Sequence, residues 1–504
     1  MSNPREAYES LLAELREIAV LGSIGSLAGW DERTYMPPGG AQLRSKQASL
    51  LAKLVHQRMT SPRIGQLLSA IEGSDLVRDP LSDPAVNVRE TRRSYDRATR
   101  LPEDLVRELA ETSVLAEQAW VEARKASSFA AFAPWLAKMV GLKQRQARCL
   151  GYADHPYDAL LDDYEPGETT RNVARIFESL REPLVQLIGR IMGSGRQAPL
   201  SLLERPYPAA LQEKLARQAA MAVGFDFARG RLDVTVHPFC SGVGPGDTRL
   251  TTRYDGHWFG DGFFGVLHEV GHGLYEQGLD EAHFGTPRGD SVSLGIHESQ
   301  SRLWENFVGR SRGFWRHFLP RARQTFGATL DDVGLEEWVW AINDVRPSFI
   351  RTESDETTYN LHTLLRFELE QAMLTGDLPI DDVPAAWNAK MKQYLGIAPP
   401  DDARGCLQDV HWSGGGIGYF PTYTLGNLYA AQFFEQAGAE LGDMEEQFAR
   451  GEFRPLLDWL RAKIHTHGKR YRAADLVKVV TGQPLSPEPL LGHLRRKAEE
   501  MYGV

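Results

Sequence analysis

Apolar residues recur every three or four positions along most of this chain, which is the period of amphipathic helices. The pattern predicts helices from Pro4 to about Ala28, over 41–59, over 88–101, over 102–126 and from Thr169 or Thr170 to Met192. The breaker-rich stretch "YMPPGG" (35–40) and the polar link "RDPLSDPAVN" (78–87) interrupt the series. No period of 30–45 residues repeats, which disfavours a helical-repeat solenoid. The chain is therefore predicted to be mainly α.

One stretch departs from the helical period. Within residues 231–255, Leu232, Val234 and Val236 alternate with polar positions, and a glycine-rich connection leads to Leu250. A period of two, bounded by turn residues, is typical of strands. The stretch predicts a short antiparallel hairpin that lies directly before the next helix.

Composition narrows the class of protein. A chain of 504 residues exceeds what one core usually organises, so two or more lobes are expected, although no composition shift marks a border. The formal net charge of −10 gives a nucleic-acid partner no electrostatic support. Three cysteines without CxxC spacing indicate a reducing compartment. We see neither a signal-peptide core nor a run of about 18 apolar residues, so we expect a cytoplasmic protein without a membrane span.

The clearest chemical motif is the HExxH in "GDGFFGVLHEVGHGLYEQG" (260–278). On a helix His268 and His272 project from one face, so both imidazoles can bind one ion at about 2.0–2.1 Å. Glu269 lies about 100° around the helix, beside the ion, where it can take a proton from metal-bound water. Asp261 is a candidate N-cap for this helix, and Gly278 is a candidate stop.

A chance HExxH is the alternative, and with 14 histidines it is expected in roughly one such chain in thirty. A buried helix with two unsatisfied histidines and a glutamate would be costly to desolvate, which favours the metal. A third protein ligand would leave the fourth position open. The downstream candidates are His283, Asp290, His297 and Glu298, and spacing alone does not choose between the last two.

Further motifs, in order along the chain, resemble the carboxypeptidase Taq family of metallocarboxypeptidases. They are "WDERTYMPPGG" (30–40), "HPF" (237–239), "DTRLT" (247–251), "HEVGH" (268–272), "HESQ" (297–300), "IRTESD" (350–355) and "GCLQDVHW" (405–412). The set covers nearly the whole chain, and its order is much more specific than HExxH alone. Ser354 departs from the family's usual alanine, a small change that bears on local packing more than on chemistry.

The resemblance implies an elongated, almost all-helical, two-lobed fold with a deep central groove, like angiotensin-converting enzyme and neurolysin. Residues 1–504 would form a single catalytic unit. The resemblance also implies a homodimer and one divalent ion per chain, most simply zinc, with cobalt or manganese as substitutes. It selects Glu298 as the third ligand beside His268 and His272. The predicted hairpin would then offer a strand edge to an extended peptide.

Recognition of a substrate's free C-terminal carboxylate calls for a guanidinium that binds in a bidentate manner. Arg351 in "IRTESD" and Arg249 in "DTRLT" are the candidates, and ordinary structural ion pairs are the alternative for both. His237 of the "HPF" motif is expected to contact substrate as well.

The oxyanion of a tetrahedral intermediate needs a hydrogen-bond donor beside the metal. By likeness to the related helical peptidases, His411 and Tyr423 are expected to act there, with Tyr419 in reserve. Asp355 and Glu356 are expected either to orient a ligand histidine or to cap a turn.

The sequence therefore predicts a metallocarboxypeptidase that releases single residues from peptide C-termini, with broad specificity and poor cleavage at proline. Glu269 would activate the metal-bound water. One alternative is an oligopeptide endopeptidase of the neurolysin type, and another is a non-catalytic helical scaffold that binds peptides. The intact general base disfavours the scaffold. An aminopeptidase is disfavoured because no motif of the GxMEN kind is seen.

Overall fold

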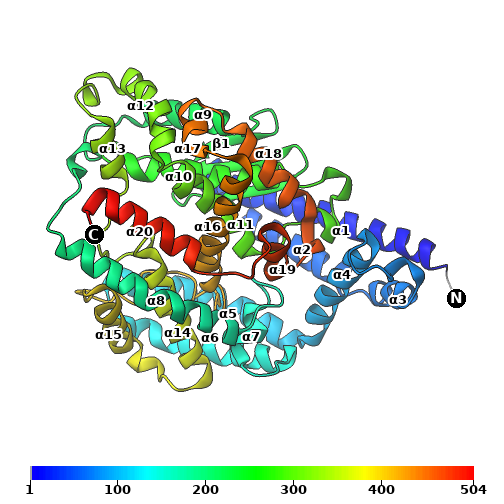
Figure 1. Cartoon of the computed structure of the whole chain (residues 1–504). Coiled ribbons are helices and arrows are strands. Elements are labelled where there is room, and N and C mark those ends of the chain that lie inside the picture. Colours follow the sequence, from blue (N-terminus) through cyan, green and yellow to red (C-terminus); the bar gives the residue numbers. More distant parts are fainter. Residues whose placement is uncertain (1–2) are drawn as a thin grey trace. The chain divides into compact units, whose positions relative to one another are not determined.

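The computed structural model describes residues 3–504, which form helices and one small sheet (Figure 1). The predicted mainly helical class is confirmed. Within the described residues, no helix combines the length and the apolarity that a membrane crossing requires. The chain divides into two compact units, and each unit is assembled from three separate segments.

Unit 1 comprises Met1–Thr99, Ala198–Ile342 and Phe433–Pro484. Its first segment holds α1 (Pro4–Thr34), α2 (Ala41–Met59), α3 (Pro62–Ile71) and most of α4 (Asp83–Arg100). The second holds α9 (Ala209–Val223), β1 (Gly230–Val234), β2 (Cys240–Gly244), β3 (Asp247–Thr252), α10 (Phe259–Glu276), α11 (Leu294–Arg302), a π-helical turn (Leu303–Val308), α12 (Arg312–Phe326) and α13 (Leu335–Ile342). The third holds α17 (Met444–Ala449), α18 (Arg454–Lys463) and α19 (Ala473–Thr481).

Unit 2 comprises Arg100–Gln197, Asn343–Gln432 and Leu485–Val504. Its helices are α5 (Glu103–Ala126), α6 (Phe129–Leu150), α7 (Pro156–Leu161), α8 (Thr170–Gly193), α14 (Tyr359–Thr375), α15 (Val383–Leu395) and α20 (Glu488–Tyr502). Helix α16 (Pro421–Leu441) contributes residues to both units. Short 3₁₀ turns connect many of these helices.

The predicted helices occur with small shifts of their ends. Thr169 rather than Thr170 is the N-cap of α8, and its side chain accepts a hydrogen bond from the amide of Asn172. Helix α1 continues past the predicted end to Thr34, and α4 begins within the predicted polar link, at Asp83. The early start of α4 buries the apolar Val86, which explains why a polar, proline-bearing segment is helical there.

A small sheet lies where the antiparallel hairpin was predicted, but it is a three-stranded mixed sheet with the order β1-β3-β2, and the two predicted strands, around Leu232 and Leu250, pair parallel. Strands β2 and β3 pair antiparallel, whereas β1 pairs parallel with β3, so that Leu232 lies opposite Leu250. Both leucines are buried, while Val234 and Val236 are 59% and 73% exposed. Strands β2 and β3 pack against α10, which places the sheet beside the HExxH helix.

The first turns of α10 are anchored in an aromatic core. Phe259 lies 5.1 Å from Phe263 and 5.0 Å from Trp338, measured between ring centroids. Trp315 of α12 lies 5.3 Å from Phe263 and 5.0 Å from Trp338. All four side chains are fully buried, so the helix that carries the candidate ligands has a rigid base.

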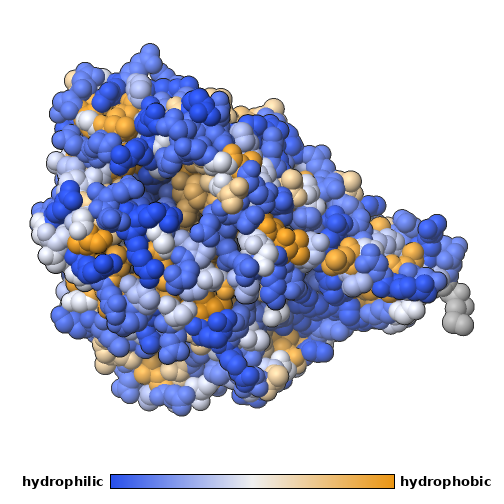
Figure 2. Space-filling view, in the orientation of Figure 1, coloured by the Kyte–Doolittle hydropathy of each residue, from blue (hydrophilic) through white to orange (hydrophobic). Residues whose placement is uncertain are grey.

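In contrast to this apolar core, the surface drawn in Figure 2 is mainly hydrophilic. On the visible face hydrophilic residues predominate, and apolar residues form small, separate patches. This distribution follows from the amphipathic pattern of the helices, whose polar sides face water.

Candidate metal centre

The HExxH motif lies in the second half of α10. The helix begins at Phe259 with Trp258 as N-cap, so the predicted N-cap Asp261 was wrong. Asp261 instead lies in the first turn, where its carboxylate accepts a hydrogen bond from Trp258 Nε1 at 3.1 Å. A carboxylate in the first turn is also favoured by the helix dipole. The helix ends two residues before Gly278, close to the predicted stop.

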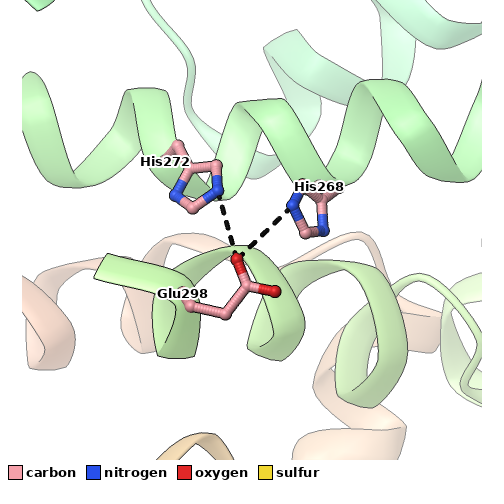
Figure 3. Close-up of side chains that lie close together, drawn as sticks. All are labelled: His268, His272 and Glu298. Atoms are coloured by element: carbon pink, nitrogen blue, oxygen red, sulfur yellow. Dashed lines mark ion pairs between the residues drawn. The ribbon is translucent and has the colours of Figure 1, made fainter. Parts of the chain in front are cut away.

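The structure brings the three predicted metal donors together (Figure 3). Glu298 is presented by α11, and its Oε2 lies 3.6 Å from His268 Nε2 and 3.5 Å from His272 Nε2. All three candidate ligand atoms lie within 4.8 Å of one another. Two ligands of a tetrahedral zinc ion are separated by about 3.3 Å when each bond is about 2.0–2.1 Å long. The donor set and its spacing therefore fit an ion of this size.

Gly271 allows α10 and α11 to approach closely enough for this arrangement. A Cβ atom at position 271 would lie 2.5 Å from the Cα of Ser301 and would also overlap the carbonyl of Gln300. A larger residue would therefore push α11 away from α10 and separate Glu298 from the two histidines.

His268 is oriented by a carboxylate on the side away from the donor cluster. Its Nδ1 lies 2.9 Å from Oε2 of Glu305, which belongs to the π-helical turn after α11. Arg302 donates to the same oxygen at 3.2 Å, and Arg310 lies 3.5 Å from the other oxygen. Burial raises the pKa of Glu305, but Arg302 and His268 outweigh it and lower the value to about 2. Glu305 is therefore a stable anion that holds the ring of His268.

Arg302 also holds the third donor. Its Nε donates to Glu298 Oε1 at 2.7 Å, which leaves Oε2 of Glu298 facing the histidines. Burial raises the pKa of Glu298, yet Arg302 and the two histidines keep it well below its usual range. Glu298 is therefore ionised, as a metal ligand must be.

His272 is backed by a second histidine instead of a carboxylate. Its Nδ1 lies 2.6 Å from Nδ1 of His297, and His297 Nε2 lies 2.8 Å from Oε1 of Glu276. His297 is thus a neighbour of the donor cluster and not part of it. The other candidates form ion pairs elsewhere, His283 with Asp83 and Asp290 with Lys469.

Glu269 has the surroundings expected of a general base. It is 6% exposed, and its buried Oε2 has no hydrogen-bond partner among the described residues. Burial raises the pKa of Glu269 to about 7. A carboxylate with such a pKa can accept and return a proton near neutrality.

Unit 2 gathers a second group of predicted residues around the "GCLQDVHW" motif. His411 Nε2 lies 3.2 Å from the hydroxyl of Tyr423, and the ring of Tyr419 lies 5.3 Å from that of His411. Burial lowers the pKa of His411 to about 4, so this imidazole is neutral near pH 7. The group therefore combines a neutral imidazole with two phenols.

Arg351 belongs to the same unit and is 5% exposed. It donates from Nε and Nη2 to one oxygen of Asp409, at 3.0 and 2.9 Å, and from Nη1 to the hydroxyl of Tyr359 at 2.6 Å. Its guanidinium also lies 4.7 Å from the ring centroid of Tyr423. Asp409 is shared with the buried Arg366. Two guanidiniums thus meet one carboxylate, which leaves a net positive charge in the cluster.

The two remaining candidates for substrate binding, Arg249 and His237, lie in unit 1. Arg249 projects from β3, where both oxygens of Asp247 accept from its guanidinium at 2.8 Å, and it lies 4.2 Å above the ring of Trp30. His237 is exposed in the connection between β1 and β2. Asp247 balances the charge of Arg249, in contrast to the surplus around Arg351.

Sequence reasoning missed the groups that orient the ligands. Among the residues that the structure describes, neither Asp355 nor Glu356 orients His268 or His272. Asp355 instead caps a turn, because its carboxylate accepts hydrogen bonds from the amides of Thr357 and Thr358. The side chains that contact His268 and His272 are instead Glu305 and His297, respectively. Glu305 follows Glu298 by seven residues, two helical turns, so a search for an acid on the ligand-bearing face would have found it.

Comparisons with known proteins find a matching family and several similar chains. The family described as carboxypeptidase Taq (M32) metallopeptidase matches residues 10–498. Thermostable carboxypeptidase 1 of Thermus thermophilus is 53% identical, over 99% of this chain and 100% of its own length. Carboxypeptidase 1 of Bacillus subtilis is 38% identical, over 97% of each chain. The crystal structure of an M32 carboxypeptidase from Deinococcus radiodurans superposes with a TM-score of 0.96 at 41% identity, covering 99% of this chain and 100% of that one.

Proposed function

The chain belongs to the carboxypeptidase Taq (M32) family of metallopeptidases, and from this premise we propose that it releases single residues from peptide C-termini. The observation that carries the proposal is the junction of α10 and α11, where His268, His272 and Glu298 converge. We propose that they hold one divalent ion, with zinc as the first choice and cobalt or manganese as substitutes.

Glu269 is proposed as the general base. A bound divalent ion supplies Lewis acidity, which lowers the pKa of water and polarises a peptide carbonyl. The buried Oε2 of Glu269 is open to accept the proton of the attacking water. The same carboxyl then returns this proton to the leaving amine, so Glu269 ends the cycle ionised as it began.

His411 and Tyr423 are proposed as donors to the oxyanion of the tetrahedral intermediate, with Tyr419 in reserve. Support comes from the 3.2 Å contact between His411 Nε2 and the Tyr423 hydroxyl. The low pKa of His411, caused by burial, keeps the imidazole neutral. A neutral imidazole can donate one N–H hydrogen bond to an oxyanion, and it lacks the second, easily lost proton of an imidazolium.

Arg351 is proposed as the residue that reads the terminal carboxylate, with Arg249 and His237 as further substrate contacts. The surplus positive charge that Arg351 and Arg366 leave around Asp409 favours an incoming anion. Arg249 is the weaker candidate because Asp247 balances its charge one to one, which leaves no surplus to attract an anion. Peptides with proline next to the cleaved bond should react poorly, since the fixed φ and the missing N–H disturb an extended register.

The proposal is tested by the polarity of cleavage. A metal-loaded sample should shorten a free-acid peptide one residue at a time from its C-terminus and should leave the C-terminally amidated peptide nearly intact. Mass spectrometry of the fragments over time distinguishes this ladder from internal cuts. Internal cuts at equal rates on acid and amide would instead establish an endopeptidase of the neurolysin type.

Two arginine variants extend the same measurement. Arg351→Ala should lower kcat/KM on the free acid by about 10- to 100-fold, because a buried charge-assisted contact is worth about 1.5–3 kcal/mol. It should change the slow reaction of the amide little. Arg249→Ala is the matched control, and a larger loss in that variant would move the carboxylate-reading role to Arg249.

Homodimer formation and a cytoplasmic location are also proposed, on the family resemblance and on the cysteine content respectively. Light scattering on the purified protein measures the mass in solution. A mass of one chain across the micromolar range would contradict the dimer.

A further inference from the structure

We propose that His297 and Glu276 form a relay that fixes the orientation and the tautomer of the ligand His272. The inference rests on the proposed metal centre and assigns a positioning function to two residues outside the donor set. Neither residue contacts the reacting atoms. Both act through the imidazole of His272.

The relay is a continuous row of short contacts. It runs from His272 Nδ1 to His297 Nδ1 at 2.6 Å and from His297 Nε2 to Glu276 Oε1 at 2.8 Å. His272 Nε2, at the other end of the row, faces Glu298 Oε2. Glu276 follows His272 by one turn of α10, whereas His297 comes from α11, so the row crosses between the two helices that carry the donors.

The contacts allow a single direction for the hydrogen bonds when His272 binds a metal. An imidazole that donates its Nε2 lone pair carries its proton on Nδ1, so His272 Nδ1–H must be the donor. Nδ1 of His297 is then the acceptor, and the proton of the neutral His297 ring resides on Nε2. That N–H donates to the carboxylate of Glu276. Every nitrogen of the row thereby has one defined role.

Packing holds the relay in place. The ring of His297 packs against those of His272 and Tyr275, with centroid distances of 4.6 and 5.2 Å. Glu276 occupies space that Gly242 of β2 leaves open, because a Cβ at position 242 would lie 2.8 Å from Glu276 Cδ. The sheet therefore contributes to the metal centre by making room for the last carboxylate of the row.

The two ligand histidines are thus supported in different ways. Glu305 contacts His268 directly, and its side chain is 13% exposed. For His272 the carboxylate acts through a second ring, and the Glu276 side chain is 24% exposed. Because a neutral nitrogen accepts the hydrogen bond of His272, loss of that acceptor leaves the Nδ1 proton unsatisfied beside the metal.

The test is zinc affinity of the metal-free protein, measured by competition with a chelator. His297→Leu, which removes the acceptor, should weaken zinc binding by about 10- to 100-fold, the usual cost of losing a group that orients a ligand. His297→Asn should bind zinc much more tightly than His297→Leu, because its Oδ1 can occupy the place of Nδ1 and accept from His272. The visible absorption of bound cobalt should change in the leucine variant and return towards wild type in the asparagine variant.

Two variants outside His297 protect the test from a folding defect. Glu276→Leu and Gly242→Ala should each weaken zinc binding, the second by displacing the carboxylate of Glu276. Gly256→Ala is the matched control, since a Cβ at position 256 meets no atom within 4 Å, and it should bind zinc as the wild type does.

The possible results separate the two proposals. Zinc affinity of His297→Leu equal to wild type would overturn the relay and leave the carboxypeptidase proposal intact. Equal weakness of the asparagine and leucine variants would overturn the assigned direction of the hydrogen bond. A wild-type protein that binds no zinc, cobalt or manganese would overturn the metal centre, and the relay with it.

Discussion

At the residue scale, His297 and Glu298 show what spacing can and cannot predict. The HExxH pair was predictable because residues four apart on one helix share a face whatever surrounds the helix. The choice of Glu298 over its neighbour depends on how α11 is rotated against α10. That rotation is set by the contact of Gly271 with the backbone of Gln300 and Ser301, which no local spacing encodes. Glu298 was predicted as the third ligand because the sequence resembles the carboxypeptidase Taq family.

The Tyr423 hydroxyl offers a test at the same scale. Tyr423→Phe should lower kcat by about 10²–10³-fold with little change in KM, because an oxyanion donor acts chiefly in the transition state. Steady-state kinetics on a free-acid peptide measure both constants. Tyr419→Phe is the matched control, and it should lower kcat much less. A reversed order of the two losses would assign the donor role to Tyr419.

At the element scale, β1 and β3 were predicted as strands, but β2 and the pairing of the three strands were not. Alternation of apolar residues identifies a strand, but β1 and β2, neighbours in the sequence, do not pair, because β3 lies between them. The parallel pairing of β1 with β3 joins residues 18 positions apart, such as Leu232 and Leu250. The start of α10 shows the same limit, since Trp258 is the N-cap and the better capping residue Asp261 is not. Tertiary contacts outweighed local preference in both places.

The buried carboxylate of Glu356 connects helix α20 to the rest of unit 2, and its removal should lower the stability of the fold. Glu356 precedes α14 in the sequence. Its carboxylate forms one ion pair with Lys497 and another, at 3.4 Å, with His493, and both of these partners belong to α20. Burial raises the pKa of Glu356, but Lys497 and His493 outweigh it and hold the value far below the usual range. Glu356→Gln should therefore lower the free energy of unfolding at pH 7 by about 3 kcal/mol, since Lys497 is left without its partner.

The stability that Glu356 contributes should depend on pH in a definite direction. A depressed pKa in the folded state means that the ionised carboxylate stabilises the fold above the unfolded value of 4.5, and that this contribution is lost as the pH falls below it. The difference between wild type and Glu356→Gln should thus be largest near neutrality and shrink in acid. Denaturant unfolding at several pH values measures it. The exposed pair Arg454–Asp458 is the control, and Asp458→Asn should change stability little. A difference that grows in acid would contradict the account.

At the scale of the whole molecule, length and composition led to the expectation of more than one lobe, and the structure has two compact units. Their borders were not predictable because each unit is built from three segments and one border lies inside α16. A chain that passes between units within a helix has no polar linker to mark the place. The deep groove and the single catalytic unit implied by the family resemblance stay predictions.

The functional residues also follow the division of the chain. The proposed metal donors, Glu269 and the proposed relay lie in unit 1, whereas the proposed substrate and oxyanion contacts lie in unit 2: Arg351, His411, Tyr419 and Tyr423. The donors were predicted from a local motif and a family likeness. Their supporting residues, Glu305 and Arg302, were not, because their importance arises from contacts that exist only in the folded chain.

The central claim is that one ion at His268, His272 and Glu298 serves a reaction in which Glu269 moves the proton. The most direct measurement is metal content per chain beside the rate of C-terminal residue release, in wild type, Glu269→Gln and Glu298→Gln. Glu269→Gln should keep one ion and lose about 10²–10⁴-fold in kcat, because it removes the base and spares the donors. Glu298→Gln should lose the ion. A Glu269→Gln protein that retains its ion and turns over at the wild-type rate would contradict the account.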